Sequence, residues 1–308
     1  MNRIKILLFS AMLLLAGTMR AQVGKTIVLE GADILNSNQG FTLSHSGVQG
    51  MDVWGNYLVS LQAGGTAWIY NFSGTGISLI GSLSLASAGS NNHSNLASFS
   101  NQFYATGDKL PLLYITRANG TVDADGMSNV AFVERINPDN LTTTLVQKIC
   151  FTGINGAGQY IIDRQNNFLY VWGNTIGNGA TGNKHYVRKF KIPAVGAGQA
   201  DKVWLNESDA LESYNWEDYY TGGANPVIQG GAVKDNLMYL PCGYDSEGYP
   251  SVLYVWDLKN RKMLKELTLT GLFVGELEDC SVNYDNELVI QANSDHIYMI
   301  SLDNVYNW

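Results

Sequence analysis

Polar side chains that could hydrogen-bond a ligand recur at one position of a repeated strand pattern. Four positions carry carboxamides and a fifth carries two acids, and the residues are Gln49, Asn95, Gln159, Gln229 and the pair Glu278 and Asp279. Carboxamides and carboxylates can hydrogen-bond sugar hydroxyls and peptide groups. If the fold brings these positions together, they predict a ligand site. The alternative is that these side chains hydrogen-bond one another and trapped water.

Two histidines precede two of these positions. His45 lies four residues before Gln49, and His93 lies two residues before Asn95. The histidines lack the compact spacing of zinc ligands and no third ligand is evident, so we predict neither a metal nor another cofactor. As general bases they would need a nucleophile within about 3 Å. We include both as polar loop residues of the predicted ligand site.

A long insertion at 206–225 combines acids with aromatic residues. Its sequence is NESDALESYNWEDYYTGGAN, and Glu212 and Trp216 are its candidate ligand contacts. Aromatic rings offer apolar faces for sugar rings, and carboxylates accept hydrogen bonds from hydroxyls. The insertion therefore predicts a lid that forms one wall of a ligand site. The alternative is that its aromatic residues fasten the insertion to the body of the fold.

The segment 119–129, NGTVDADGMSN, has the alternating acids of a calcium-binding turn. Asp123, Asp125 and Gly126 match part of such a loop. The segment lacks the remaining acids and the final glutamate of the full pattern, so no calcium site is predicted.

The elements that would position these residues are short strands. Apolar and polar residues alternate in short runs, and Gly, Asn and Asp turns separate the runs. Five units of up to four strands follow one another, and they span 49–85, 95–151, 159–205, 229–269 and 278–303. In the third unit the last strand is expected at 201–205. Self-similarity of this kind is typical of a repeat architecture.

One segment carries a resemblance to a known class of repeats. The sequence LYVWDLKNRKMLKELTL at 253–269 resembles the third and fourth strands of WD-like and YVTN-like β-propeller repeats. The resemblance covers nearly all of 25–303 and implies an all-β, five-bladed β-propeller, with each first strand lining a central channel. Six blades and a pair of β-sandwiches are the alternatives. No specific propeller family is matched, because the G-H…W-D tetrad spacing of true WD40 blades is absent.

The last unit lacks its fourth strand. The segment Lys25–Glu30, KTIVLE, has the alternation of a strand and belongs to no other unit. We predict that Thr26–Glu30 forms the outer strand of the final blade and so closes the ring. Such a pairing would remove two open strand edges.

Residues 1–21 resemble a secretory signal peptide. Arg3 and Lys5 precede an apolar run at 6–16 that is too short to span a bilayer comfortably, and Ala21 is a plausible cleavage position. The mature domain is therefore expected at 22–308, in a secreted or periplasmic protein of bacterial type. No cysteine for a lipid anchor follows the cleavage position. The alternative is a retained membrane anchor.

Charge and cysteine content limit the partners. Signal cleavage would remove three basic residues and no acid, which lowers the net charge from −8 to −11. This argues against nucleic acid as a partner. The odd number of cysteines, which are Cys150, Cys242 and Cys280, predicts buried thiols, although a Cys242–Cys280 disulfide is conceivable.

These features together predict a secreted propeller that binds a carbohydrate or protein ligand through one face of the ring and is not a catalyst. The rival is a glycan-active hydrolase or lyase, in which Glu278 or Asp279 would take part in turnover. Motifs for a serine nucleophile, a zinc protease or a phosphate-binding loop are missing from the sequence. Oligomeric state and the identity of the ligand are not determined by these patterns.

Overall fold

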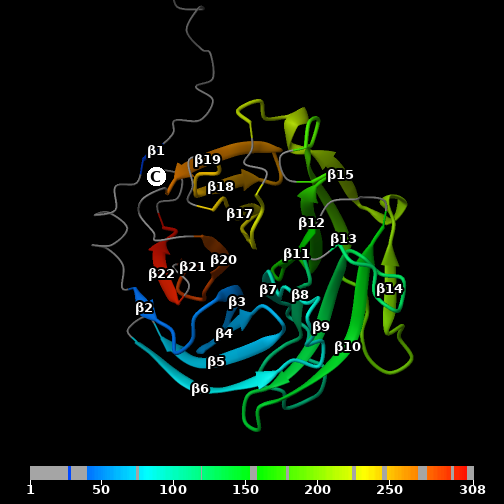
Figure 1. Cartoon of the computed structure of the whole chain (residues 1–308), viewed down its shortest axis with the longest axis vertical. Coiled ribbons are helices and arrows are strands. Elements are labelled where there is room, and N and C mark those ends of the chain that lie inside the picture. Colours follow the sequence, from blue (N-terminus) through cyan, green and yellow to red (C-terminus); the bar gives the residue numbers. More distant parts are fainter. Residues whose placement is uncertain are drawn as a thin grey trace, which may run out of the picture.

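The computed structural model describes residues 27–28, 40–73, 76–118, 120–152, 158–177, 180–223, 227–244, 248–269, 276–292 and 295–303. Five small sheets stand in a ring about a common axis, as in a five-bladed β-propeller (Figure 1). The predicted all-β, five-bladed fold is therefore confirmed. The predicted signal segment at 1–21 lies outside the described residues.

Each blade begins with the strand nearest the axis and runs outward through antiparallel hairpins. Blade one contains β3 (Val48–Trp54), β4 (Tyr57–Gln62), β5 (Thr66–Ser73) and β6 (Gly76–Ser84). Blade two contains β7 (Leu96–Phe99), β8 (Leu113–Thr116), β9 (Val130–Asn137) and β10 (Thr142–Phe151). Blade three begins with β11 (Gly158–Asp163), β12 (Phe168–Asn174) and β13 (His185–Lys191).

Blade four contains β16 (Ala232–Lys234), β17 (Leu237–Cys242), β18 (Val252–Asp257) and β19 (Lys262–Thr268). Blade five contains β20 (Leu277–Val282), β21 (Glu287–Ala292) and β22 (His296–Ser301). The turn between β16 and β17 shows how the sequence sets these hairpins. Asp235 and Asn236 both have positive φ, which the two-residue turn between right-twisted strands requires and which Asp and Asn tolerate.

The outer strand of blade three differs from the expectation. The segment Lys202–Leu205 (β14) pairs in parallel with β10 and is a fifth strand of blade two. Blade three is completed instead by β15 (Glu212–Asn215), which pairs with β13. The prediction assumed that consecutive strands pair. The long connection after β13 carries the chain back to blade two, and a parallel pair needs such a crossover.

Closure of the ring also differs in its details. The outer strand of blade five does come from the N-terminal region, but it is β2 (Phe41–Thr42), which pairs antiparallel with β22. The predicted strand at Thr26–Glu30 was wrong in its place. Its described part, β1 (Ile27–Val28), pairs in parallel with β19 of blade four. The last two blades thus both gain a strand from the N-terminal region.

The core lies between neighbouring blades, where apolar side chains of facing sheets interlock. All six residues of β11 and all six of β20 are buried, because inner strands are covered by a blade on each side. Polar residues on these strands must therefore find partners within the fold. Cys150, Cys242 and Cys280 are buried free thiols, so the conceivable disulfide does not form. No helix in the described part is long and apolar enough to cross a membrane.

Candidate functional site

The middle of the ring axis is closed by the carboxylate of Asp279. Its Oδ1 accepts the backbone N–H groups of Gly231 and Cys280, both at 2.8 Å, and its Oδ2 accepts those of Met51 at 2.8 Å and Ala97 at 3.0 Å. These donors belong to four of the five blades. Burial raises the pKa of Asp279, and the four N–H donors act in the opposite direction. The side chain holds the inner strands together at the axis.

The inner strands approach so closely here that two positions accept only glycine. A Cβ on Gly230 would lie 1.7 Å from the Asp279 carboxylate, and a Cβ on Gly50 would lie 2.6 Å from the backbone of blade two at Leu96 and Ala97. Such distances are far below any van der Waals contact. The axis is consequently packed solid at this level, and the two ends of the ring present separate surfaces.

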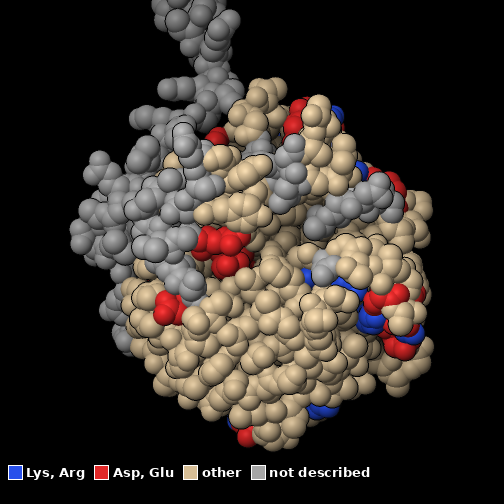
Figure 2. Space-filling view, viewed as in Figure 1, with Lys and Arg blue, Asp and Glu red and all other residues tan. Residues whose placement is uncertain are grey.

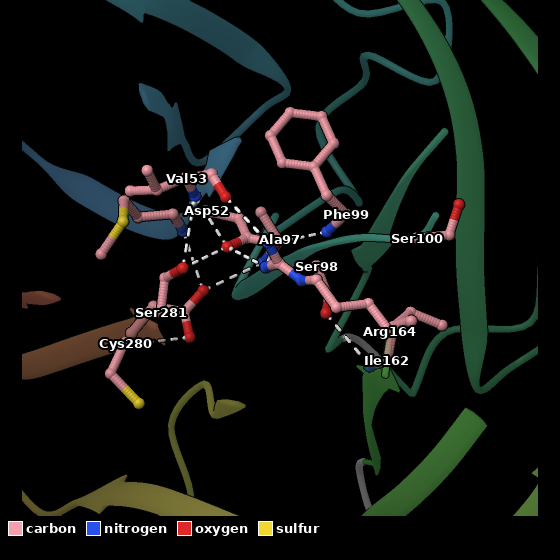
Figure 3. Close-up of polar contacts among 12 residues, drawn as sticks. Asp52, Val53, Ala97, Ser98, Phe99, Ser100, Ile162, Arg164, Cys280 and Ser281 are labelled. Atoms are coloured by element: carbon pink, nitrogen blue, oxygen red, sulfur yellow. Dashed lines mark hydrogen bonds and ion pairs between the residues drawn. The ribbon is translucent and has the colours of Figure 1, made fainter. Parts of the chain in front are cut away.

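A second polar cluster lies toward the C-terminal ends of the inner strands (Figure 3). Arg164 donates from Nη2 to both carboxylate oxygens of Asp52 at 2.7 Å and from Nη1 to the carbonyl oxygen of Val53 at 2.9 Å. The Asp52 carboxylate also accepts hydrogen bonds from the hydroxyl of Ser281 and the N–H of Phe99. This buried cluster links blades one, two, three and five. It forms the floor of the cavity described next.

A cavity of about 300 Å³ opens at this end of the ring. The C-terminal ends of all five inner strands and the turns after them supply its walls. Its polar and aromatic lining includes Asp52, Trp54, Asn101, Arg164, Lys234 and Tyr284. This volume is at the lower end of the range of small-molecule sites.

The aromatic rings of Trp54 and Tyr284 line this cavity, and Phe103 lies beside Trp54. Trp54 meets Phe103 and Tyr284 edge to face, with ring centroids 5.8 and 5.7 Å apart, and Arg164 lies over the Trp54 ring at 5.7 Å. Tyr284 is 63% exposed and Phe103 is 46% exposed. Burial raises the pKa of Tyr284, and the positive charge of Arg164 opposes the effect. Exposed aromatic surface beside a cavity is typical of a binding site.

The predicted carboxamide positions Gln49, Asn95, Gln159 and Gln229 lie at the opposite, N-terminal end of the inner strands. The structure brings two of them together, since Asn95 Nδ2 donates to Gln229 Oε1 at 3.4 Å across the axis. Gln229 also donates to Glu276. Gln159 is buried, and its Oε1 has no hydrogen-bond partner among the described residues. For Asn95 and Gln229 the alternative of mutual hydrogen bonding is therefore observed, and contact with a ligand stays a prediction.

Gln49 and His93 are less engaged. Gln49 is partly buried and donates from Nε2 to the carbonyl oxygen of its neighbour Val48 at 2.9 Å. His93 is exposed, and its ring makes no hydrogen bond within the described part of the chain. Figure 2 shows Asp and Glu side chains gathered near the middle of one face, near the place of β20 in Figure 1, with mostly uncharged surface around them.

Glu278 differs sharply from its neighbour Asp279. Its side chain is 8% exposed and has no described hydrogen bond. Burial raises the pKa of Glu278 to about 9, and the negative charges of Glu276 and Asp279 add to the effect. The carboxyl group is thus neutral at pH 7 in the folded protein.

We expect Glu278→Gln to flatten the pH dependence of stability. A raised folded-state pKa stabilises the fold fully below the unfolded pKa of about 4.5, and this contribution is lost as the pH rises toward 9. The amide stays neutral in both states, so the variant should be more stable at pH 8 by on the order of 2 kcal/mol. Melting temperatures from pH 5 to 9 measure this, with the exposed Asp201→Asn as control. Parallel curves for wild type and Glu278→Gln would contradict it.

His45 lies beside a serine but the pair is not an activated nucleophile. His45 Nε2 is 3.1 Å from Ser60 Oγ, and Ser60 donates its own proton to Gln291 Oε1 at 2.6 Å. The Gln291 orientation is fixed because its Nε2 donates to the carbonyl oxygen of Gln49 at 2.6 Å. With its proton given to Gln291, the Ser60 hydroxyl does not donate to His45 in this arrangement. Burial lowers the pKa of His45, and its ring stacks on Trp68 at 4.8 Å.

The insertion at 206–225 is largely part of the fold. Trp216 follows β15 in a short 3₁₀ turn and has no exposed surface, since it packs between Trp172 and Trp256 at 4.6 and 4.9 Å. Glu212 pairs with Lys189 at 3.0 Å. The aromatic residues thus fasten the insertion to the propeller, as the alternative expected, and Trp216 offers no surface as packed. Residues 224–225 lie outside the described part.

The acids of the calcium-like turn are paired with basic side chains. Lys148 forms ion pairs with both Asp123 and Asp125, and Lys202 lies 2.8 Å from Asp125. A calcium ion would have to displace these ammonium groups. Within the described ranges, no three His, Cys, Asp or Glu side chains group as a metal site.

Comparisons with known proteins give structural likenesses of low similarity. No protein-family model and no curated protein matches the chain. The computationally designed Ika8 protein has 12% sequence identity and a TM-score of 0.36, over 85% of this chain and 98% of its own. Glutaminyl cyclase of Myxococcus xanthus has 10% identity and a TM-score of 0.46, over 85% of this chain and 93% of its own. Similarity at this level adds nothing to the assignment of function.

The cavity residues were not among the predicted site residues. One signal for them exists in the sequence, since Asp52 lies three residues beyond the repeated polar position of the first unit. Arg164 and Tyr284 lie a few residues beyond that position in the third and fifth units, in the turns after the first strands. Nothing in the sequence shows that these turns meet around a hollow. The ring arrangement alone brings them together.

Proposed function

We propose that the chain is a secreted β-propeller that binds a carbohydrate in the cavity at the C-terminal ends of its inner strands, without catalysing a reaction. The observation that carries this proposal is the aromatic-rimmed cavity of about 300 Å³ where turns of all five blades meet. The secretory pattern of residues 1–21 supports an extracytoplasmic location.

The chemistry of the cavity favours a sugar ring. Tyr284 and Phe103 present exposed aromatic surface, against which the apolar face of a sugar can pack. Asn101 and the partly exposed Arg164 supply polar groups at the wall for hydroxyls. The mixture of apolar surface with a few fixed polar groups is typical of small-molecule sites.

A binding role fits better than hydrolysis. Among the cavity-lining residues that the structure describes, Asp52 is the one carboxylate. Its oxygens are engaged by Arg164, Ser281 and two backbone N–H groups. Glycoside hydrolysis ordinarily uses two carboxyl groups on opposite sides of the scissile bond, one of them free to transfer a proton.

The test is removal of the most exposed ring at the mouth of the cavity. The full chain is expressed in a bacterial host, and the recovered protein is expected to begin at Gln22. It is screened against neutral and acidic oligosaccharides, and binding is measured by calorimetry. Tyr284→Ala should weaken binding about tenfold, which corresponds to about 1.4 kcal/mol.

The matched control is Tyr244→Ala, because Tyr244 is 46% exposed and does not line the cavity. The control should bind as wild type does. Equal binding by the Tyr284→Ala and Tyr244→Ala variants would place the sugar elsewhere. Release of a shortened sugar by wild-type protein would support the hydrolase instead.

A further inference from the structure

We infer that this cavity selects sugars that carry a carboxylate, with Lys234 as the group that recognises the negative charge. The inference rests on the proposed carbohydrate-binding function and specifies its ligand class as hexuronates. Lys234 ends β16 and lines the cavity, together with Trp54 and Tyr284 from blades one and five.

The charges of the cavity leave one cation uncompensated. Asp52 and Arg164 neutralise each other, with Arg164 Nη2 at 2.7 Å from both carboxylate oxygens. The remaining acceptor capacity of Asp52 is taken by Ser281, Val53 and Phe99. Lys234 is partly exposed and has neither an ion pair nor a side-chain hydrogen bond with the described residues.

The neighbouring acid does not remove this excess charge from the cavity. Asp235 is exposed in the turn after β16, and its carboxylate accepts a hydrogen bond from Gln165 Nε2 at 2.9 Å. Asp235 is not part of the cavity lining, whereas Gln165 and Lys234 are. Lys234 is therefore the one basic side chain of the described cavity lining without an ion-pair partner, and we expect an anionic ligand to pair with it.

A singly charged carboxylate matches this one cation better than a dianionic phosphate does. One ammonium group matches one negative charge, and a charge-assisted hydrogen bond to a carboxylate is about twice as strong as a neutral one. A dianionic phosphate would need a second free cation, and Arg164 is already held by Asp52. Because the chain as a whole has a net charge of −8, only such a local excess would favour an anionic ligand.

The experiment compares sugars that differ only in the charged group. Oligomers of glucuronate and glucose, and of galacturonate and galactose, are titrated against the full-chain protein at low and high salt. At low salt we expect at least one of the acidic oligomers to bind about tenfold more tightly than its neutral partner. The preference should shrink at high salt, because salt screens partly exposed charges.

Lys234→Gln tests the residue. It should reduce the acidic-to-neutral preference to near onefold, while the melting temperature stays as in wild type. The matched control is Lys259→Gln, since Lys259 is an exposed lysine in the β18–β19 turn and does not line the cavity. The control should keep the wild-type preference.

The outcomes separate this inference from the proposed function. Equal binding of acidic and neutral sugars would overturn the selection of hexuronates and leave carbohydrate binding in place. A preference that survives in Lys234→Gln would also overturn the assignment, because the charge would be recognised elsewhere. Failure of wild type to bind any of the four oligomers would overturn both.

Discussion

Asp279→Ala is expected to destabilise the protein by about 4 kcal/mol or more. The substitution removes the acceptor of four buried N–H groups, on Met51, Ala97, Gly231 and Cys280. Each buried donor left without a partner costs on the order of 1–3 kcal/mol, and water entering the gap would recover part of that cost. Urea denaturation followed by tryptophan fluorescence measures the loss.

Two further variants make the test specific. Asp279→Asn should lie between wild type and the alanine variant, because one oxygen remains and the new amide faces N–H donors. Asp285→Ala removes an exposed acid from a turn of the same blade and should change stability by less than about 0.5 kcal/mol. If Asp279→Ala unfolds at the same urea concentration as wild type, the closure of the axis does not depend on this carboxylate.

This result also bears on the hydrolase hypothesis. Loss of an activity in Asp279→Ala would follow from a damaged fold as readily as from a missing catalytic acid. Glu278 is the informative position, because its side chain holds no described hydrogen bond and its replacement by glutamine preserves shape. An activity that disappears in Glu278→Gln without a loss of stability would support catalysis at that end of the ring.

The second large effect is expected at Trp216. Its indole is fully buried between Trp172 of blade three and Trp256 of blade four, and Tyr254 meets it edge to face at 5.3 Å. Replacing a buried tryptophan with alanine costs about 3–5 kcal/mol. For a chain of this size, that loss lowers the melting temperature by on the order of 10 °C.

Trp204→Ala is the matched control, because Trp204 is 45% exposed on β14. It removes the same side chain from the surface and should cost well under half as much. Calorimetric melting of both variants checks the difference. Equal losses would mean that the aromatic stack between blades three and four does not hold them together. Because Trp216 is buried, its replacement tests the stability of the fold before it tests ligand binding.

The local sequence determined most of the hairpin strands and the number of blades. Alternation of apolar and polar residues, with turns such as Asp235-Asn236, sets hairpins one by one, because period-2 burial and positive-φ turns are local properties. Five repeats of that pattern can bury both faces of every inner strand when the blades pack side by side in a closed ring. The all-β, five-bladed fold was therefore predictable from the sequence.

The tertiary structure decided which distant segments meet. β14 pairs in parallel with β10 of blade two, which comes earlier in the chain than blade three. β1 pairs in parallel with β19 of blade four, which comes much later in the chain. Local alternation is the same whichever edge a strand joins, so it cannot choose between them. Trp216 shows the same limit. A tryptophan among acids predicts an exposed side chain in the wall of a ligand site. In the structure β15 is the outer strand of blade three, and the Trp216 side chain that follows it is buried in the core.

The clearest case is the pair Glu278 and Asp279. In sequence they are equivalent acids at the start of one strand, but a register shift between Leu277 and Asp279 places them differently against β21. One carboxylate then receives four backbone N–H groups from four blades, while the other is buried with no described partner. The sequence by itself determined that polar groups gather along the axis. Only the ring fixes where backbone N–H groups of separate blades converge, and this decided which polar groups stabilise the fold. The ring also decided which end of the propeller carries the cavity.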